Sequence, residues 1–248
     1  KENGEVIAIL YMDYYPRESK RSGAWMTTFR EQWYTQDGEK VIPIVSLVLN
    51  SAKPTADAPS LLTFDQTETF FHEFGHGLHG MLTDCKYRSL SGTNVARDFV
   101  ELPSQIFEHW ASEPEVLKMY AKHYQTGEVI PDELIQKLNA ASYYGQGSIN
   151  TELIASSLLD MKYHTITEPT KIELPHFERD YLASVGLIPE IIARHSSAYF
   201  NHIFGGSYDS QYYYYTWSAV LDNDAFEAFK ENGIFDPTTA KLYKDNIL

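Results

Sequence analysis

The sequence is poor in cysteine, and this limits both its cross-links and its metal chemistry. Cys85 is the only cysteine among the 248 residues, so the chain cannot form an internal disulfide or a cluster of thiolates. Any metal ion that the chain holds must therefore be bound by histidine, aspartate or glutamate. We also do not expect Cys85 to act as a catalytic nucleophile.

Long apolar runs and basic runs are missing as well. No apolar stretch approaches the ~20 residues that span a bilayer, and no signal-peptide pattern opens the chain, so we expect a soluble protein without membrane contacts. The net charge of −14, with no basic run longer than ESKR, argues against nucleic acid as a partner. The single cysteine is compatible with a cytoplasmic protein. Because the chain begins at KENGEVIAIL without a methionine, we expect a fragment of a longer chain, from which a targeting signal would be missing.

Residues 1–248 are predicted to form a single domain that is mainly α, with a small β-sheet near the N-terminus (α+β). EVIAILYMDYY and VIPIVSLVLNS are rich in β-branched and aromatic residues, which is typical of strands. From about Thr63 onward the apolar spacing becomes helical, and it predicts helices within 64–82, 95–112, 113–124, 131–142, 150–164 and 215–233. With 43% hydrophobic residues, the chain can bury a sizeable core.

The stretch TETFFHEFGHGLHG contains the pattern His-Glu-x-x-His. Each residue of an α-helix turns by about 100°, so His72 and His76 share one face and their imidazoles converge on one point. Glu73, at the edge of that face, can reach a water molecule on a metal ion without binding the ion itself. The pattern also occurs by chance on packed helices. Here the helix is otherwise apolar, and a buried glutamate is costly unless it has a purpose.

A catalytic zinc ion usually has a third protein ligand, and Glu101 is our candidate for it. It follows the expected loop TDCKYRSLSGTN and stands on the next predicted helix, which Pro103 is expected to kink. Asp98, one turn earlier, either accepts the spare N–H of a liganding histidine or is simply solvated. His79 has the wrong spacing for a ligand, and we expect it to be structural.

A second candidate stretch, NHIFGGSYDSQYYYYTWS, is rich in tyrosine. If it is helical, Tyr208, Tyr212 and Tyr215 share one face, where their hydroxyls could stabilise a developing oxyanion. Aromatic stripes at helical spacing are more often core, which is the alternative for these residues and in particular for Tyr213 and Tyr214. Two glycines would allow an extended substrate to approach the backbone closely; they are Gly205 and Gly206.

Several separated blocks together resemble the thimet oligopeptidase family of zinc metallopeptidases, peptidase family M3. They are YMDYYPRESKRSGAW, FHEFGHGLHG, SGTNVARDFVELPSQIFEHWA and HIFGGSYDSQYYYYTW. The SGTN, EHWA and HIF segments look most like the bacterial dipeptidyl carboxypeptidases of that family. The resemblance implies a zincin-type helical catalytic domain, with short peptides as substrates. It also implies a helical region preceding this segment in the parent chain, which is absent here.

The resemblance also assigns roles to residues. It implies one Zn²⁺ per chain, bound by His72, His76 and Glu101, with Glu73 as the general base. Tyr215 is implied as the main oxyanion donor, and the other implied substrate contacts are His202, Tyr208 and Tyr212. Ser207 departs from the pattern, because the family usually has glycine at that position. This change is expected to stiffen or reshape the loop.

Three functions remain open from the sequence. The first is a peptidase that releases dipeptides from free C-termini, and the second is an endo-acting oligopeptidase of the same family. They differ in whether a positive group holds the substrate carboxylate. The third is a truncated module that binds zinc or peptide without catalysis.

Overall fold

The computed structural model describes residues 3–168 and 171–248, which form two compact units. The first unit consists of the described residues up to Ile135 together with Ala219–Leu248, and the second consists of Gln136–Ser218. The predicted fold class is confirmed, because the chain is mainly helical with a small mixed sheet near its N-terminus. The single catalytic domain over residues 1–248 stays a prediction.

The first unit begins with a three-stranded sheet in the order β1-β5-β2. Its strands are β1 (Ile9–Asp13), β5 (Ile44–Val48) and β2 (Trp25–Arg30). β1 runs parallel to β5, whereas β2 runs antiparallel to it. A separate hairpin pairs β3 (Trp33–Tyr34) with β4 (Lys40–Val41). The sequence predicted the strands that became β1 and β5, and it missed β2.

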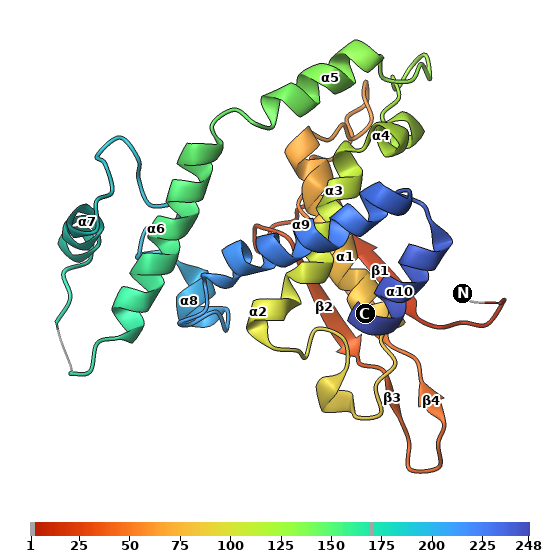
Figure 1. Ribbon diagram of the computed structural model, residues 1–248, viewed down its shortest axis with the longest axis horizontal. Coiled ribbons are helices and arrows are strands. Elements are labelled where there is room, and N and C mark those ends of the chain that lie inside the picture. Colours follow the sequence, from red (N-terminus) through yellow and green to blue (C-terminus); the bar gives the residue numbers. More distant parts are fainter. Residues whose placement is uncertain (1–2, 169–170) are drawn as a thin grey trace. The chain divides into compact units, whose positions relative to one another are not determined.

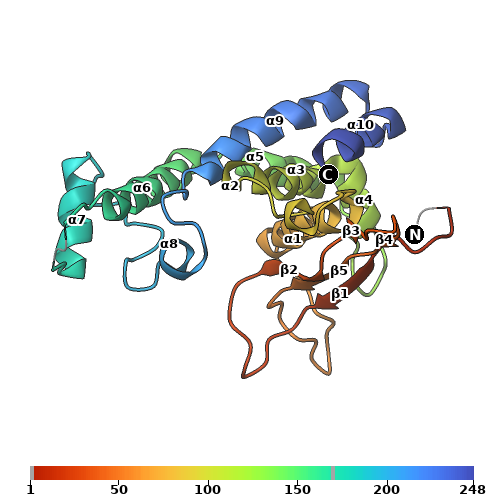
Figure 2. The same cartoon turned by 90° about the horizontal axis from the view of Figure 1, so that it is seen from below.

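The helix α1 (Phe64–Leu82) lies between this sheet and a second helix, α3 (Leu102–Ser112) (Figure 2). Thr63 begins α1 with a reciprocal capping box, in which its hydroxyl accepts from the Gln66 N–H and the Gln66 side chain accepts from the Thr63 N–H. On the sheet side Gly77 packs against the buried Leu47 of β5. The helix that carries the histidines is therefore fixed on both sides.

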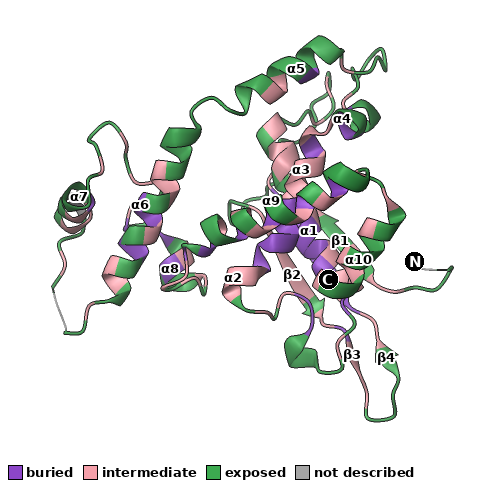
Figure 3. Ribbon diagram, in the orientation of Figure 1, coloured by how far each residue is buried: buried purple, intermediate pink, exposed green. Residues whose placement is uncertain are grey.

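The first unit also contains a 3₁₀ turn and several helices of at most 11 residues (Figure 1). They are the 3₁₀ turn η1 (Arg88–Leu90), α2 (Arg97–Val100), α4 (Pro114–Tyr120) and α10 (Pro237–Ile247). Buried residues gather along α1, whereas α10 has none (Figure 3). The first unit also includes α9 (Tyr214–Asn232) from Ala219 onward, where Phe226 and Phe229 pack with Ile106 of α3.

The second unit is helical. It contains α6 (Gln146–His164), α7 (Leu174–Ser184), α8 (Asn201–Gly205), the start of α9 and the end of α5 (Asp132–Ala141). Its core is formed by Leu159 of α6, Leu182 of α7, Ile203 of α8 and the neighbouring Phe200 and Tyr212. The sequence predicted α5, α6 and α9 and missed α7, α8 and α10. Across the described part of the chain, each helix is too short or too polar to cross a bilayer.

Candidate metal centre

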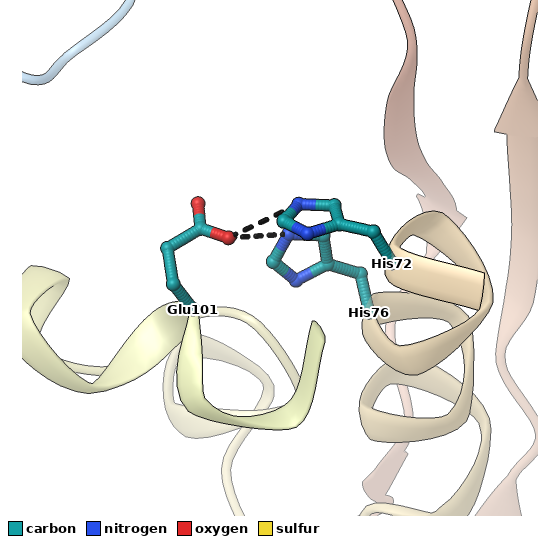
Figure 4. A group of neighbouring side chains, drawn as sticks. All are labelled: His72, His76 and Glu101. Carbon is teal, nitrogen blue, oxygen red and sulfur yellow. Dashed lines mark ion pairs between the residues drawn. The ribbon is translucent and has the colours of Figure 1, made fainter. Parts of the chain in front are cut away.

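Two histidines of α1 point toward a glutamate on a neighbouring segment (Figure 4). His72 and His76 stand one helical turn apart, and their ring centroids are 4.9 Å apart with the planes nearly perpendicular. His76 is buried and His72 is partly buried. The helical spacing thus brings the two imidazoles together as the sequence predicted.

Glu101 lies at the junction between α2 and α3 and is only 1% exposed. Its Oε2 atom is 3.2 Å from Nε2 of His72 and 3.1 Å from Nε2 of His76. The Ser104 hydroxyl donates to the same Oε2 at 2.7 Å, which fixes the carboxylate. The helix predicted over 95–112 divides at Glu101, close to the kink that was expected at Pro103. Pro103 falls in the first turn of α3, where its missing N–H costs nothing.

Glycine at position 75 allows α3 to begin directly against α1. A Cβ atom at this position would lie 2.2 Å from the carbonyl oxygen of Pro103 and 2.7 Å from Cα of Ser104. Both atoms belong to the backbone, so no side-chain rotation could relieve the overlap. Gly75, one residue before His76, therefore sets the distance between the histidines and Glu101.

The three side chains fit a zinc ion. Their ligand atoms lie within 4.8 Å of one another, and this is the one such group of three or more metal-ligating side chains among residues 3–168 and 171–248. Zinc binds imidazole nitrogen and carboxylate oxygen at ~2.0–2.2 Å, so tetrahedral ligand atoms stand about 3.3 Å apart. The 3.1 and 3.2 Å separations from Glu101 are close to that value.

His72 and Glu101 shift each other's pKa values. Burial alone would lower the pKa of His72, but hydrogen bonds to Glu101 and Glu108 outweigh it and raise that pKa well above its usual range. Burial alone would raise the pKa of Glu101, but His76 and His72 hold it well below its usual range. Glu101 is therefore a carboxylate, the form that binds a cation.

Glu73 is buried beside this group, as the sequence predicted, and is 5% exposed. Its Oε2 atom has no hydrogen-bond partner among the residues that the structure describes. Burial raises the pKa of its carboxyl group. A buried carboxylate without a protein partner is suited to receive a proton from a molecule that enters the site. His79 is also buried, and burial lowers its pKa to about 4. It lies outside the group of ligating side chains, as its spacing predicted, and its structural role stays a prediction.

Glu108 is a partner of His72 that was not predicted from the sequence. Its Oε1 atom is 2.5 Å from Nδ1 of His72, so Nε2 of the same ring faces Glu101. Such a carboxylate fixes the orientation and tautomer of a liganding histidine. The signal was present, since Glu108 follows Glu101 by two helical turns. For Asp98, which lies on α2 and is partly buried, the same role stays a prediction.

The second unit brings together His202, Tyr208, Tyr212 and Tyr215. The His202 ring centroid lies 5.5, 5.6 and 6.5 Å from those of Tyr208, Tyr212 and Tyr215, respectively. Tyr208 stacks on Tyr215, with their centroids 6.0 Å apart. The proposed helical stripe is wrong, because residues 206–213 form bends and turns and α9 begins only at Tyr214. The turns nevertheless gather the predicted side chains into one cluster, which we call the tyrosine cluster.

The tyrosines of residues 208–215 differ in how far their side chains are exposed to a ligand. Tyr212 is 3% exposed and its hydroxyl lies 3.1 Å from Nε2 of His195, a residue that the sequence analysis did not consider. Tyr208 and Tyr215 are partly exposed. The core alternative for Tyr214 is confirmed, since it is fully buried, whereas Tyr213 is exposed.

Gly205 and Gly206 lie close to other residues of the same unit. A Cβ atom on Gly206 would lie 2.9 Å from the carbonyl oxygen of His202, so the absence of a side chain is used within the unit. A Cβ atom on Gly205 would lie 3.0 Å from Oδ1 of Asn201. Contact of either glycine with a substrate stays a prediction. Ser207 adopts φ of 65°, in the left-handed region that glycine tolerates best, which explains why glycine suits this position.

Comparisons with known proteins agree on one family. The model of Peptidase family M3 matches residues 1–248. Dipeptidyl carboxypeptidase of Escherichia coli (strain K12) is 43% identical over 248 residues, which are 99% of this chain and 36% of that protein. Oligopeptidase A of the same organism is 39% identical over 249 residues, which are 100% of this chain and 37% of that protein. The chain thus spans about a third of the length of these relatives. From the match over its whole length, the chain belongs to peptidase family M3.

Proposed function

We propose that this protein is a zinc metallopeptidase acting on short peptides, with His72, His76 and Glu101 as the zinc ligands. The observation that carries the proposal is the meeting of two imidazole nitrogens and one carboxylate oxygen beside the buried, unpartnered carboxylate of Glu73. Three protein ligands leave a fourth position on zinc for water or substrate. A purely structural zinc site would fill that position with a fourth side chain.

The chemistry follows from these roles. Bound zinc would lower the pKa of a water molecule toward ~7 and polarise the carbonyl group of the scissile peptide bond. Glu73 takes a proton from the attacking water and then transfers it to the leaving amine. Glu101, kept ionised by the two histidines, and Glu108, on the far side of the His72 ring, hold the ligand set in place.

The tyrosine cluster is proposed to stabilise the negative charge that develops on the carbonyl oxygen. Tyr215 is the proposed main donor, and Tyr208 and His202 assist it. Partial exposure of all three side chains supports this assignment. Tyr212 is proposed to support the cluster from within, because it is buried and its hydroxyl already meets His195. Loss of one oxyanion donor typically lowers kcat by ~10²–10³.

Glu73→Gln tests the proposed base. In the full-length protein this change should leave zinc binding near its original level and reduce peptide hydrolysis by at least ~10²-fold, because the amide cannot accept the proton. Zinc is counted by elemental analysis and hydrolysis is followed with a quenched fluorescent peptide. Normal turnover in the variant would refute the role of Glu73. Zinc binding without hydrolysis in the unmodified protein would favour the non-catalytic module instead.

We propose release of C-terminal dipeptides as the mode of cleavage, supported by the 43% identity to a protein named dipeptidyl carboxypeptidase. The alternative is endo-acting cleavage, supported by the 39% identity to oligopeptidase A. An exopeptidase of this kind needs a free substrate carboxylate, whereas an endopeptidase does not. A peptide and its C-terminally amidated form therefore separate the two modes: dipeptide release predicts strong loss with the amide, and endo-acting cleavage predicts similar rates.

A further inference from the structure

Residues 206–213, which carry Tyr208 and Tyr212 of the tyrosine cluster and join α8 to α9, have an unfavourable backbone conformation at two positions. Ser207 and Ser210 have φ of 65° and 62°, where the Cβ atom of an L-residue crowds the following carbonyl oxygen. Such conformations persist only when surrounding contacts hold them. Residues 206–213 must therefore be fixed by groups outside the turn.

A buried aspartate on α6 supplies such contacts. Asp160 is 0% exposed, and its two carboxylate oxygens accept from different backbone N–H groups of the turn. Oδ1 accepts from Ser210 at 2.9 Å and Oδ2 accepts from Tyr212 at 2.9 Å. Hydrogen bonds to an ionised carboxylate are stronger than those between neutral groups. One side chain thereby binds two backbone N–H groups of the turn, one on each side of Gln211.

The Asp160 carboxylate is itself held by the next turn of α6. Nδ1 of His164 lies 2.7 Å from Oδ1 of Asp160 and 2.9 Å from its backbone carbonyl oxygen. An N–H at this nitrogen is therefore shared between the two acceptors. The two backbone N–H groups and His164 together give the buried carboxylate the partners that burial requires.

Tyr212 links the backbone of the turn to the other side chains of the tyrosine cluster. Its N–H is held by Asp160, its hydroxyl lies beside His195, and its ring packs against Phe200 at 4.9 Å. Against this fixed ring lie Tyr215, at 5.2 Å, and His202, at 5.6 Å. A shift of the Tyr212 backbone would therefore displace the side chains that are proposed to meet the oxyanion.

We propose that Asp160 is a positioning residue for hydrolysis, which holds the turn 206–213 so that Tyr215, Tyr208 and His202 keep their mutual arrangement. This inference rests on the proposed function of the tyrosine cluster. Asp160 acts through the backbone and takes no part in the chemistry. Because displacement of a catalytic group by about 1 Å can cost ~10²-fold in rate, loss of this anchor should lower kcat.

Asp160→Asn in the full-length zinc-loaded protein is the test. The amide presents one acceptor oxygen and one donor group, so it can keep only one of the two backbone hydrogen bonds. Glu178→Gln is the matched control, because Glu178 in the same unit also caps a loop, accepting from the N–H of Ser197 at 2.7 Å and from its hydroxyl at 2.6 Å. Both variants are compared by amide hydrogen exchange, zinc content, kcat and KM.

For Asp160→Asn we expect at least tenfold faster exchange at the amides of Ser210 and Tyr212, unchanged zinc, and kcat lower by about 10- to 100-fold with KM changed little. Glu178→Gln should alter exchange near Ser197 and leave kcat within about twofold of the original value. Unchanged exchange at Ser210 and Tyr212, or an unchanged kcat in Asp160→Asn, would overturn the inference. An equal loss of kcat in both variants would also overturn it, since the effect would then be general destabilisation.

Two further results would not prevent the test: failure of Asp160→Asn to fold, and absence of hydrolysis by the unmodified protein. If Asp160→Asn does not fold, His164→Gln replaces it. This variant removes one donor to Asp160 and should speed exchange at the same two amides by a smaller factor, and no change would overturn the inference. If the unmodified zinc-loaded protein hydrolyses no peptide, the proposed function fails, whereas the exchange results still decide whether Asp160 anchors the turn.

Discussion

The metal centre and the tyrosine cluster are built in opposite ways. His72 and His76 project from the interior of a regular helix, and Glu101 is brought to them by a close contact between two helices. The tyrosine cluster is assembled by turns with two residues in left-handed conformations, held by a distant aspartate. A helix fixes its side chains by its own geometry, whereas a turn needs support from outside. Substitutions in the metal centre and in the tyrosine cluster should therefore have different effects.

Gly75→Ala should have the largest effect, and it should disrupt the metal centre without altering the tyrosine cluster. The new methyl group would lie 2.2 Å from the carbonyl oxygen of Pro103, so α3 would have to move away from α1. We expect a loss of about 3 kcal/mol in the free energy of unfolding and a marked loss of zinc. Denaturant unfolding and zinc titration would measure both.

The control for that change is Gly147→Ala on α6, where a Cβ atom meets nothing within 4 Å. This helical position should gain up to about 1 kcal/mol, because alanine favours helix more than glycine does. Equal behaviour of the two variants would contradict the view that Gly75 sets the spacing of the metal centre.

Glu108→Gln should weaken zinc binding by about 10- to 100-fold without removing a ligand, because the amide is a weaker acceptor for Nδ1 of His72. Glu115→Gln, an exposed change on α4, serves as the control and should leave the zinc Kd unchanged. Zinc affinity can be measured by competition with a chelating dye. An unaltered Kd in Glu108→Gln would remove Glu108 from the metal centre.

Ser207→Gly should stabilise the second unit by up to about 1 kcal/mol, since glycine adopts φ of 65° without the cost that serine bears there. Ser157→Gly, in the middle of α6, should instead destabilise by about 1 kcal/mol. Thermal unfolding of the two variants tests this difference in sign. Destabilisation by both changes would show that the turn does not carry the expected backbone strain.

A pH dependence that involves His195 is expected as well. Burial lowers the pKa of His195 to about 4 from an ordinary value of 6.5. The unfolded chain then binds more protons than the folded one between these values, so this contribution to stability is present above pH 6.5 and is lost as the pH falls toward 4. His195→Gln should reduce the fall in Tm between pH 7 and pH 5. An identical fall in both proteins would exclude His195 as a source of it.

The parts that the sequence predicted are those in which helical periodicity decides the geometry. The range of α1 and the convergence of His72 with His76 follow from apolar spacing alone, and both match the structure. The closeness of Gly75 to Pro103 and the link from Asp160 to Tyr212 depend on contacts between segments distant in sequence. No periodicity encodes such contacts, which is why Asp160 was missed. Glu108 was missed although its helical spacing from Glu101 is visible in the sequence. β2 was missed as well, although its strand completes the sheet under α1.

Whether the three side chains converge to bind one zinc ion can be tested by measuring metal content. Zinc should be counted per chain in the purified protein, in Glu101→Ala, and in Glu115→Ala as an exposed control. We expect about one zinc per chain in the unmodified protein and in the control, and little or none in Glu101→Ala. Equal zinc in all three proteins, or none in folded protein after zinc is added, would show that these side chains do not form the zinc site.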